Sequence, residues 1–158
     1  MTVISYTDGA SRGNPGPGGY GTRIEYKAPD GTLHVREYSQ GYKETTNNRM
    51  ELMGVIAGFK ALIKPCNVTV YTDSQYIASA FNENWIENWQ KKNWKTSNRK
   101  PVKNRELWEE LISLTKVHNC TFIWVKGHDG NPGNERCDQL ATTAADGDDL
   151  LDDLGYEE

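Results

Sequence analysis

The sequence predicts one α/β domain, in which a mixed β-sheet is covered by helices. Strand-like alternation fills the first part of the chain, and two short β-branched runs return later, separated by stretches with helical periodicity. A chain of 158 residues can bury one sizeable core but is too short for two ordinary domains. We therefore expect a single catalytic or binding unit.

The N-terminal part is expected to hold three neighbouring antiparallel strands. Residues 2–7 alternate between apolar and polar side chains, and the Gly- and Pro-rich run at 13–19 would follow the end of this strand. Residues 20–26 and 32–38 predict two further strands. Pro29-Asp30-Gly31 supplies the residue types of the turn between them.

The middle of the chain alternates helices with short strands. Apolar residues recur at helical spacing over residues 45–63 and again over 106–117, and each stretch predicts a helix. The β-branched run 68–72 and residues 121–125 predict strands. This order gives the alternation of elements that a mixed α/β sheet requires.

The C-terminal part divides into a helix and an acidic tail. Residues 127–133 predict a flexible loop, and Asn134 is expected to cap the final helix. Residues 146–158 contain seven acidic residues and no basic one. We expect this tail to be poorly ordered and the folded domain to span residues 1–145.

Residues 82–105 predict a surface excursion with a strong positive charge. Residues 91–105 hold seven basic residues and no acidic one, although the whole chain has a formal net charge of −4. Tryptophans are interleaved with these bases and with amides. A solvated excursion anchored by aromatic residues is the plain interpretation, but like charges this dense also favour a polyanionic partner.

Hydropathy and cysteine spacing indicate where in the cell the protein is expected. Mean hydropathy is −0.76, and the apolar stretches are too short to span a bilayer. The three cysteines are far apart, which excludes a Cys-x-x-Cys zinc knuckle and a disulfide framework. We expect a cytoplasmic protein with reduced thiols, no membrane partner and no small-molecule cofactor.

Four acidic residues have predicted positions that a role in solubility alone explains poorly. Asp8 and Asp73 each follow a predicted strand, so their carboxylates would meet at one sheet edge if those strands are neighbours. Helical geometry places Glu51 and Asp138 beside the apolar faces of their helices. Singly, these acids could be a turn, a helix cap and two charges at the rim of the core.

Jointly, the four acids favour a metal site. Converging carboxylates repel one another unless a cation neutralises them, and hard oxygen ligands select Mg²⁺ or Mn²⁺ over zinc. A pair of such ions about 4 Å apart can activate a water and stabilise the leaving oxygen of a phosphodiester.

Several motifs together resemble one family. They are Thr7-Asp8-Gly9, residues 13–21, residues 45–52, residues 72–76, Val125-Lys126-Gly127-His128 and residues 134–138. In this order and spacing they resemble bacterial ribonuclease H, type 1, over roughly residues 1–145. The resemblance implies a ribonuclease H-like fold with a five-stranded sheet, three antiparallel strands being followed by two parallel ones. It also implies Mg²⁺-dependent endonucleolytic cleavage of the RNA strand of an RNA–DNA hybrid, with two ions bound alongside the substrate and Mn²⁺ as a possible substitute.

The resemblance also assigns roles to catalytic residues. It makes Asp8, Glu51, Asp73 and Asp138 the metal ligands. His128 matches a mobile-loop histidine that passes protons near the attacking water or the leaving group, a role suited to a side chain that titrates near neutrality. Without the surrounding motif, His128 would be read as a solvated loop histidine.

Substrate contacts follow from the same match. Asn14, Asn47 and Gln75 resemble minor-groove contacts to the hybrid, where amides could recognise the RNA 2′-hydroxyl. Thr46 and Asn104 match positions that hold a phosphate of the DNA strand. The excursion resembles a basic protrusion, and its expected contacts are Trp85, Lys91, Lys92, Trp94 and Lys95. Turn and cap chemistry remains the alternative for Asn14 and Asn47.

Two other functions remain open from the residues. Related folds use clustered acids in polynucleotidyl transferases and resolvases that act on DNA. A non-catalytic hybrid-binding module would need the basic segment but not the full set of acids. We expect a monomer that acts as a metal-dependent hydrolase, yielding 5′-phosphate and 3′-hydroxyl ends.

Overall fold

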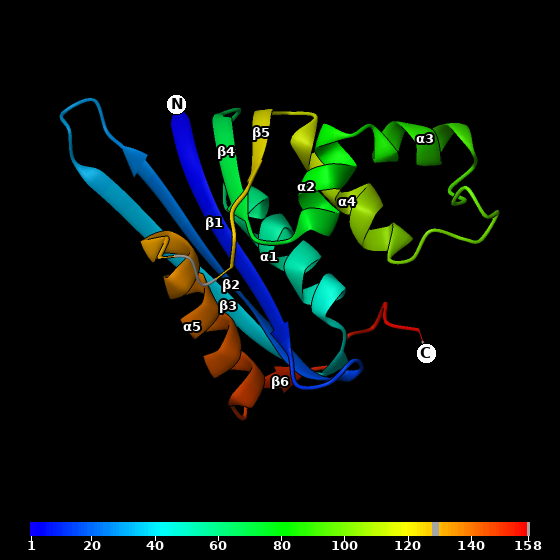
Figure 1. The fold of residues 1–158 in the computed structure, drawn as a ribbon. Coiled ribbons are helices and arrows are strands. Elements are labelled where there is room, and N and C mark those ends of the chain that lie inside the picture. Colours follow the sequence, from blue (N-terminus) through cyan, green and yellow to red (C-terminus); the bar gives the residue numbers. More distant parts are fainter. Residues whose placement is uncertain (128–129, 158) are drawn as a thin grey trace.

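The computed structural model describes residues 1–127 and 130–157. They form a six-stranded sheet with the order β5-β4-β1-β2-β3-β6 (Figure 1). The strands are β1 (Thr2–Ser11), β2 (Gly16–Lys27), β3 (Leu33–Thr45), β4 (Asn67–Thr72), β5 (Asn119–Trp124) and β6 (Leu150–Leu151). The helices are α1 (Asn47–Lys60), α2 (Gln75–Asn82), α3 (Trp85–Lys91), α4 (Arg105–Thr115) and α5 (Pro132–Asp146).

The expected pairing of the first five strands is confirmed, and β6 adds a sixth strand that was not predicted. Strands β1, β2 and β3 pair antiparallel, whereas β4 pairs parallel with β1 and β5 pairs parallel with β4. Helix α5 covers one face of the sheet, and α1 covers the other (Figure 1). Strand β2 separates the two layers, because Gly19 and Gly21 face α5 while Tyr20 and Thr22 face Gly54 of α1.

The main core lies between the sheet and helices α1, α2 and α4. Leu52 and Val55 of α1 pack with Val70 of β4, and all three are fully buried. Trp108 of α4 is also fully buried, and its indole N–H donates a hydrogen bond to the hydroxyl of Tyr76, 2.9 Å away. This contact fixes α4 against α2 without leaving a buried donor unpaired. None of the described helices has the length and apolar character needed to cross a membrane.

Strands β1 and β2 extend into the segment that we expected to be a loop. Strand β1 continues through Asp8 and Gly9 to Ser11, and β2 already begins at Gly16. The prediction that Asp8 follows the first strand is therefore wrong. These glycines allow close packing rather than a turn: a side chain at Gly21 would overlap the backbone of α5, and one at Gly9 would overlap the backbone of α1.

Helix α5 begins earlier than expected. Its cap is Asn131, whose side chain accepts a hydrogen bond from the backbone N–H of Asn134, and Pro132 occupies the first turn. Proline suits that position, because the first helical N–H groups lack an intrahelical partner. Asn134 is thus not the cap, and its side-chain amide donates instead to the carbonyl of Thr7, 3.4 Å away.

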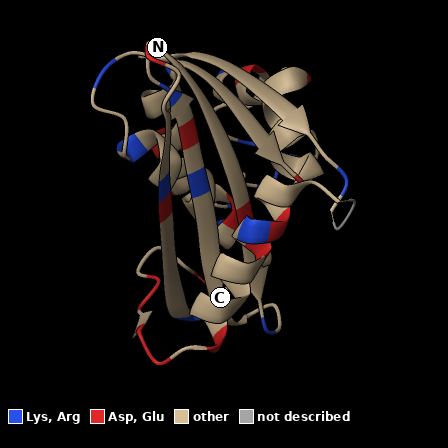
Figure 2. Cartoon of the chain, turned by 90° about the vertical axis from the view of Figure 1, so that its left-hand side faces the viewer, with Lys and Arg blue, Asp and Glu red and all other residues tan. Residues whose placement is uncertain are grey.

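The C-terminal tail is the largest departure from expectation. We predicted that residues 146–158 would be poorly ordered, but Leu150–Leu151 forms β6 and pairs in parallel with Gly41 and Tyr42 of β3. The Asp153 side chain is 1% exposed and forms an ion pair with Arg49. Figure 2 shows the acidic residues that follow α5 gathered at one end of the molecule. Composition alone missed these specific contacts.

The basic excursion projects from the helical side of the molecule (Figure 1). Its helix α3 has no buried residue. Its attachment is aromatic: the ring centroids of Trp89 and Trp108 lie 5.2 Å apart, and those of Trp89 and Trp94 lie 6.1 Å apart. The Arg105 guanidinium lies 5.2 Å from the centroid of the Trp94 ring. The aromatic residues hold the excursion while its lysines remain exposed.

Candidate active site

Three of the four predicted carboxylates converge. Asp8, Glu51 and Asp73 each offer an oxygen atom, and these atoms all lie within 4.8 Å of one another. The sheet register explains part of this, because Thr7 of β1 pairs with Thr72 of β4 and brings the next residues, Asp8 and Asp73, to neighbouring positions. The expected proximity of these two acids is therefore confirmed, although Asp8 lies within β1, just beyond its paired stretch with β4.

Glu51 reaches the cluster from α1 through a close backbone approach. Gly9 lies directly against the backbone of Glu51, in space that a side chain would fill. The helix can therefore place Glu51 beside Asp8 at the sheet surface. Glu51 is only 3% exposed and Asp8 only 7% exposed. Glu51 is thus inside the protein and not at the rim of the core.

Burial and mutual repulsion raise the pKa values of this cluster. The pKa of Asp8 rises to about 8, chiefly because burial disfavours the charged carboxylate and next because Asp73 is nearby. Burial also raises the pKa of Glu51 well above its usual value, and the charges of Asp8 and Asp73 add to this effect. The Gly9 N–H opposes the shift at Asp8 by donating to its Oδ1 atom at 2.9 Å.

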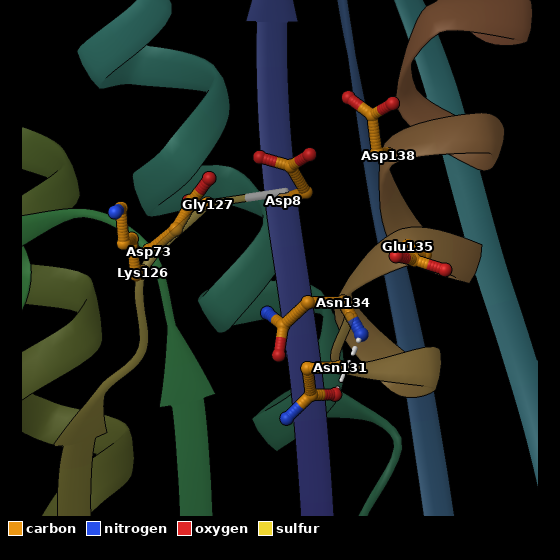
Figure 3. A pocket seen from close by; sticks show the side chains of 8 residues that line it. All are labelled: Asp8, Asp73, Lys126, Gly127, Asn131, Asn134, Glu135 and Asp138. Atoms are coloured by element: carbon orange, nitrogen blue, oxygen red, sulfur yellow. Dashed lines mark hydrogen bonds between the residues drawn. The ribbon is translucent and has the colours of Figure 1, made fainter. Parts of the chain in front are cut away.

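Asp138 stands beside the cluster without joining its closest contacts. Figure 3 shows Asp8 on β1 between Asp73 and Asp138, which comes from α5. The negative charge of Asp138 adds to the rise in the pKa of Asp8. A small pocket is lined by Asp8, Asp73, Lys126, Gly127, Asn131, Asn134, Glu135 and Asp138. Asp138 therefore faces the same pocket from α5, which covers the face of the sheet opposite α1.

The position of Asp73 is set by the chain on both sides of it. Ser74 caps α2, and its own backbone N–H donates to Thr72 Oγ1. The indole N–H of Trp124 donates to the Asp73 carbonyl at 3.0 Å. Gly127 lies against the Asp73 carboxylate, where a Cβ atom would come within 3.0 Å of Oδ2. Trp124 at the end of β5 and Gly127 just beyond it thus pack directly on Asp73.

The predicted substrate residues fall into separate groups. Asn14 and Asn47 meet, because Asn14 Oδ1 accepts the backbone N–H of Asn47 at 2.8 Å. Thr46 caps α1 and accepts the N–H of Arg49. Gln75 is exposed at the start of α2, immediately beyond Asp73 and Ser74. His128 lies outside the described residues.

The predicted excursion contacts lie apart from the acids. Trp85 and Lys91 are the first and last residues of α3, and Trp85 is 36% exposed. Lys92 and Lys95 are exposed, whereas Trp94 packs against the core. Lys91 Nζ lies 3.6 Å from Glu87, so this lysine has an acidic neighbour within its own helix.

Similarity to known proteins identifies the family. The RNase H family profile matches residues 1–146. This chain belongs to the ribonuclease H family. It is 62% identical over 154 residues to Ribonuclease H of Lachnoclostridium phytofermentans, covering 97% of this chain and 98% of that protein. It is 53% identical to Ribonuclease H of Tolumonas auensis, covering 98% of this chain and 96% of that protein.

Solved ribonuclease H structures have the same fold. The crystal structure of LC9-RNase H1 superposes with a TM-score of 0.82 at 35% identity, covering 91% of this chain and 72% of that one. LC11-RNase H1, solved in complex with an RNA/DNA hybrid, has a TM-score of 0.64 at 24% identity, covering 91% and 96%. The second likeness bears on the fold alone.

Several residues beside the acids or in the adjacent motif were not predicted from the sequence. Lys126, Asn131 and Glu135 line the acidic pocket. Arg49 is another: its side chain is 3% exposed, and it lies inside a motif whose acid and amides carry more obvious chemistry. No local pattern signals the burial of Arg49, because its partners Asp153, Asn104 and Glu106 lie far away in the sequence.

Proposed function

We propose that this chain is an endonuclease that hydrolyses the RNA strand of RNA–DNA hybrids with the help of divalent cations. The convergence of Asp8, Glu51 and Asp73 carries the proposal. Burial of carboxylates side by side is costly for stability unless a cation neutralises them. Membership of the ribonuclease H family supplies the activity that such a cluster would serve.

The donor set fits a hard divalent cation. All of the clustered side-chain donors are carboxylate oxygens, which favour Mg²⁺ or Mn²⁺ and disfavour softer metals. Glu51 Oε2 is buried and has no hydrogen-bond partner among the described residues. Asp8, Glu51, Asp73 and Asp138 would hold the cations, and Mg²⁺ is the expected ion. Two such ions would supply an activated water and charge stabilisation for the leaving oxygen.

Residues of the chain itself would select and orient the hybrid. Asn14, Asn47 and Gln75 would contact the minor groove, where side-chain amides can both donate to and accept from the RNA 2′-hydroxyl. Asn14 and Asn47 are already linked by a hydrogen bond, which supports their acting together. His128 would carry a proton at the attacking water or the leaving oxygen.

The DNA strand would be held by contacts that read no sequence. Thr46 and Asn104 would bind one of its phosphates, and the basic excursion would contact the backbone through Lys91, Lys92 and Lys95, with Trp85 and Trp94 supporting that surface. Exposure of these lysines supports the assignment. Binding and chemistry would thus be supplied by different parts of the chain.

The product ends test the reaction. An end-labelled hybrid incubated with the purified chain and Mg²⁺ should yield RNA fragments with 5′-phosphate and 3′-hydroxyl ends, because a water attacks phosphorus and the 3′ oxygen leaves. A 2′,3′-cyclic phosphate would instead require the 2′-hydroxyl as nucleophile and would refute the proposal. A hybrid with 2′-O-methylated RNA should resist cleavage, since the methyl group replaces the hydroxyl donor.

The same assay separates the alternative functions. Cleavage of duplex DNA in preference to the hybrid would indicate a resolvase or polynucleotidyl transferase. Tight binding of the hybrid without cleavage in Mg²⁺ or Mn²⁺ would indicate a binding module. The acidic cluster argues against the module, because binding a polyanion would not require buried carboxylates.

A further inference from the structure

The C-terminal tail forms one wall of a groove on the expected DNA-binding side. This groove has a volume of about 950 Å³. It lies between the start of α1, the loop that leads into α4, and the tail, and Figure 1 shows these segments approaching one another near the C-terminus. Thr46, Asn104, Lys103, Arg105, Gly155 and Tyr156 are among its lining residues. Both of the proposed phosphate contacts therefore face a groove that the tail helps to enclose.

Arg49 joins the three walls of this groove. Its Nε and Nη2 atoms donate to the two carboxylate oxygens of Asp153, at 2.7 and 3.0 Å. Its Nη1 atom donates to Asn104 Oδ1 at 3.1 Å and to Glu106 at 2.7 Å. The exposed fraction is 3% for the Arg49 side chain and 1% for the Asp153 side chain. A bidentate, buried pair of this kind holds a fixed geometry.

The side chain of Arg49 orients Asn104, whereas its backbone N–H contacts Thr46. Because Asn104 Oδ1 accepts from Arg49, the two N–H groups of the Asn104 amide are turned away from the guanidinium. One of them can reach a phosphate even while the Asn104 side chain also hydrogen-bonds the Tyr76 hydroxyl. Thr46 Oγ1 accepts the Arg49 backbone N–H at 3.3 Å, so its own O–H remains available to donate.

Asp153 in turn holds the guanidinium. Besides its bonds to Arg49, its Oδ2 atom accepts from Thr45 Oγ1 at 2.7 Å, which ties the tail to the end of β3. Gly155 then passes so close to the ion pair that a Cβ atom there would lie 2.7 Å from Arg49 Nη2 and 2.6 Å from Glu106 Oε2. The tail therefore packs directly on Arg49.

We propose that Asp153 is a positioning residue for the DNA-strand phosphate site, acting through the Arg49 guanidinium on Asn104. This inference rests on the proposed function. It gives the tail a role in substrate binding. Without Asp153 the guanidinium keeps its bonds to Glu106 but loses its partner on the tail, so Arg49 holds the Asn104 amide less firmly. The carboxylate cluster is built from other elements and keeps its geometry.

Steady-state kinetics of Asp153→Ala provides the first test. We expect KM for the hybrid to rise about 2- to 10-fold, the equivalent of one hydrogen bond, while kcat stays within about twofold. Asp153→Glu should restore part of the affinity because it keeps a carboxylate. Asp152→Asn is the matched control, since Asp152 is the preceding residue, is 71% exposed and only approaches Lys43 at 3.6 Å. It should leave both constants unchanged.

A scan of the DNA strand separates positioning from general destabilisation. Each DNA phosphate is replaced in turn by an uncharged methylphosphonate, and KM is measured. The wild-type chain should show one position where neutralisation raises KM. At that position Asp153→Ala should show little further loss, because the contact is already impaired. Equal sensitivity of both chains at every position would overturn the proposal.

The assays are run at a temperature where circular dichroism shows that every variant is folded. If Asp153→Ala does not fold, Asp153→Asn keeps one acceptor for Arg49 and should show the same KM effect in smaller measure. Normal KM in folded Asp153→Ala, or a loss confined to kcat, would contradict the inference. Failure of the wild-type chain to cleave the hybrid would instead contradict the proposed function, so the two failures are distinct.

Discussion

The acidic cluster and the basic excursion both concentrate charge of one sign, but the fold treats them in opposite ways. Asp8 and Glu51 are buried, and their oxygen atoms lie within a few ångströms of each other and of Asp73. The bases of residues 91–105 are exposed and extend from the end of α3 along the following loop to the start of α4. Water screens charges in the second region but not in the first.

This difference separates chemistry from binding. A buried cluster carries electrostatic repulsion that a bound cation or proton uptake must relieve, so it costs stability and its presence points to a catalytic use. An exposed basic surface costs little to maintain and gains energy when a polyanion releases its counterions. Variants in the two regions should therefore fail in different kinetic constants.

The largest effect is expected in the cluster. Asp8→Asn, Glu51→Gln and Asp73→Asn should each lower kcat by more than about 10⁴-fold, because each would remove a charged metal ligand worth several kcal/mol to the transition state. Hybrid cleavage under saturating substrate measures this loss. Asp152→Asn, which removes an exposed acid, serves as the control. Near-normal turnover in any one of the three variants would remove that residue from the ligand set.

Replacement of His128 should have a smaller effect. His128→Ala is expected to lower kcat by about 10²- to 10⁴-fold, the usual contribution of a positioned proton-transfer group. The pH dependence of kcat should also lose an inflection near neutrality. His34→Ala is a suitable control because this histidine stacks on Tyr26 in the β2–β3 hairpin. An unaltered pH profile and rate would exclude His128 from the mechanism.

The basic excursion should affect KM and leave kcat nearly intact. Joint replacement of its bases by alanine should raise KM by about an order of magnitude, through uniform loss of binding to ground and transition states. The slope of log affinity against log salt should flatten by about 0.9 for each phosphate that the variant no longer binds. The residues replaced are Lys91, Lys92, Lys95, Arg99 and Lys100.

The matched control for the excursion is a variant with exposed lysines removed elsewhere. Lys27, Lys64 and Lys116 are exposed and lie outside the excursion. Their replacement by alanine should change KM and the salt slope much less than the excursion variant does. If the excursion variant had a lower kcat but an unchanged KM and salt slope, the division between binding and chemistry would be wrong.

The smallest effect concerns the stability of the metal-free chain. The pKa of Asp8 is raised from 3.8 to about 8 on folding, so its contribution to stability is complete below pH 3.8 and is lost as the pH rises through about 8. Asp8→Asn should therefore stabilise the chain in EDTA by about 1 kcal/mol or more at pH 8, and by much less at pH 4. Urea unfolding at both pH values measures this. An equal effect at both would mean that Asp8 does not titrate in this range.

Much of the active site could be predicted from the sequence because short local sequence patterns mark its residues. Asp73 directly follows a β-branched run and precedes a capping serine, so its place at a strand end could be predicted. The burial of Glu51 could not, because its helical angle gives a rim position. Contact with Gly9, far earlier in the chain, decides it, and such a contact leaves no periodic signal.

The ends of elements were harder to predict for a related reason. Gly16, Gly18 and Gly19 suggested a loop, yet they lie in β2, where Gly19 lets α5 approach the sheet. Acidic composition likewise suggested a disordered tail, whereas one buried carboxylate, Asp153, orders it through Arg49. The composition of a segment indicates its average tendency to be solvated, but it does not show a single contact with a residue that is distant in the sequence.

Strand β6 also affects how copies of the chain could associate. Within the described residues, the outer edge of the long strand β3 is paired only at Gly41 and Tyr42, by Leu150 and Leu151. An open edge of this kind is a template for pairing with a second copy, and such pairing leads to aggregation. The short strand occupies the glycine-containing part of that edge, next to the start of α1. A chain shortened before β6 would expose it, and its solubility during folding would fall accordingly.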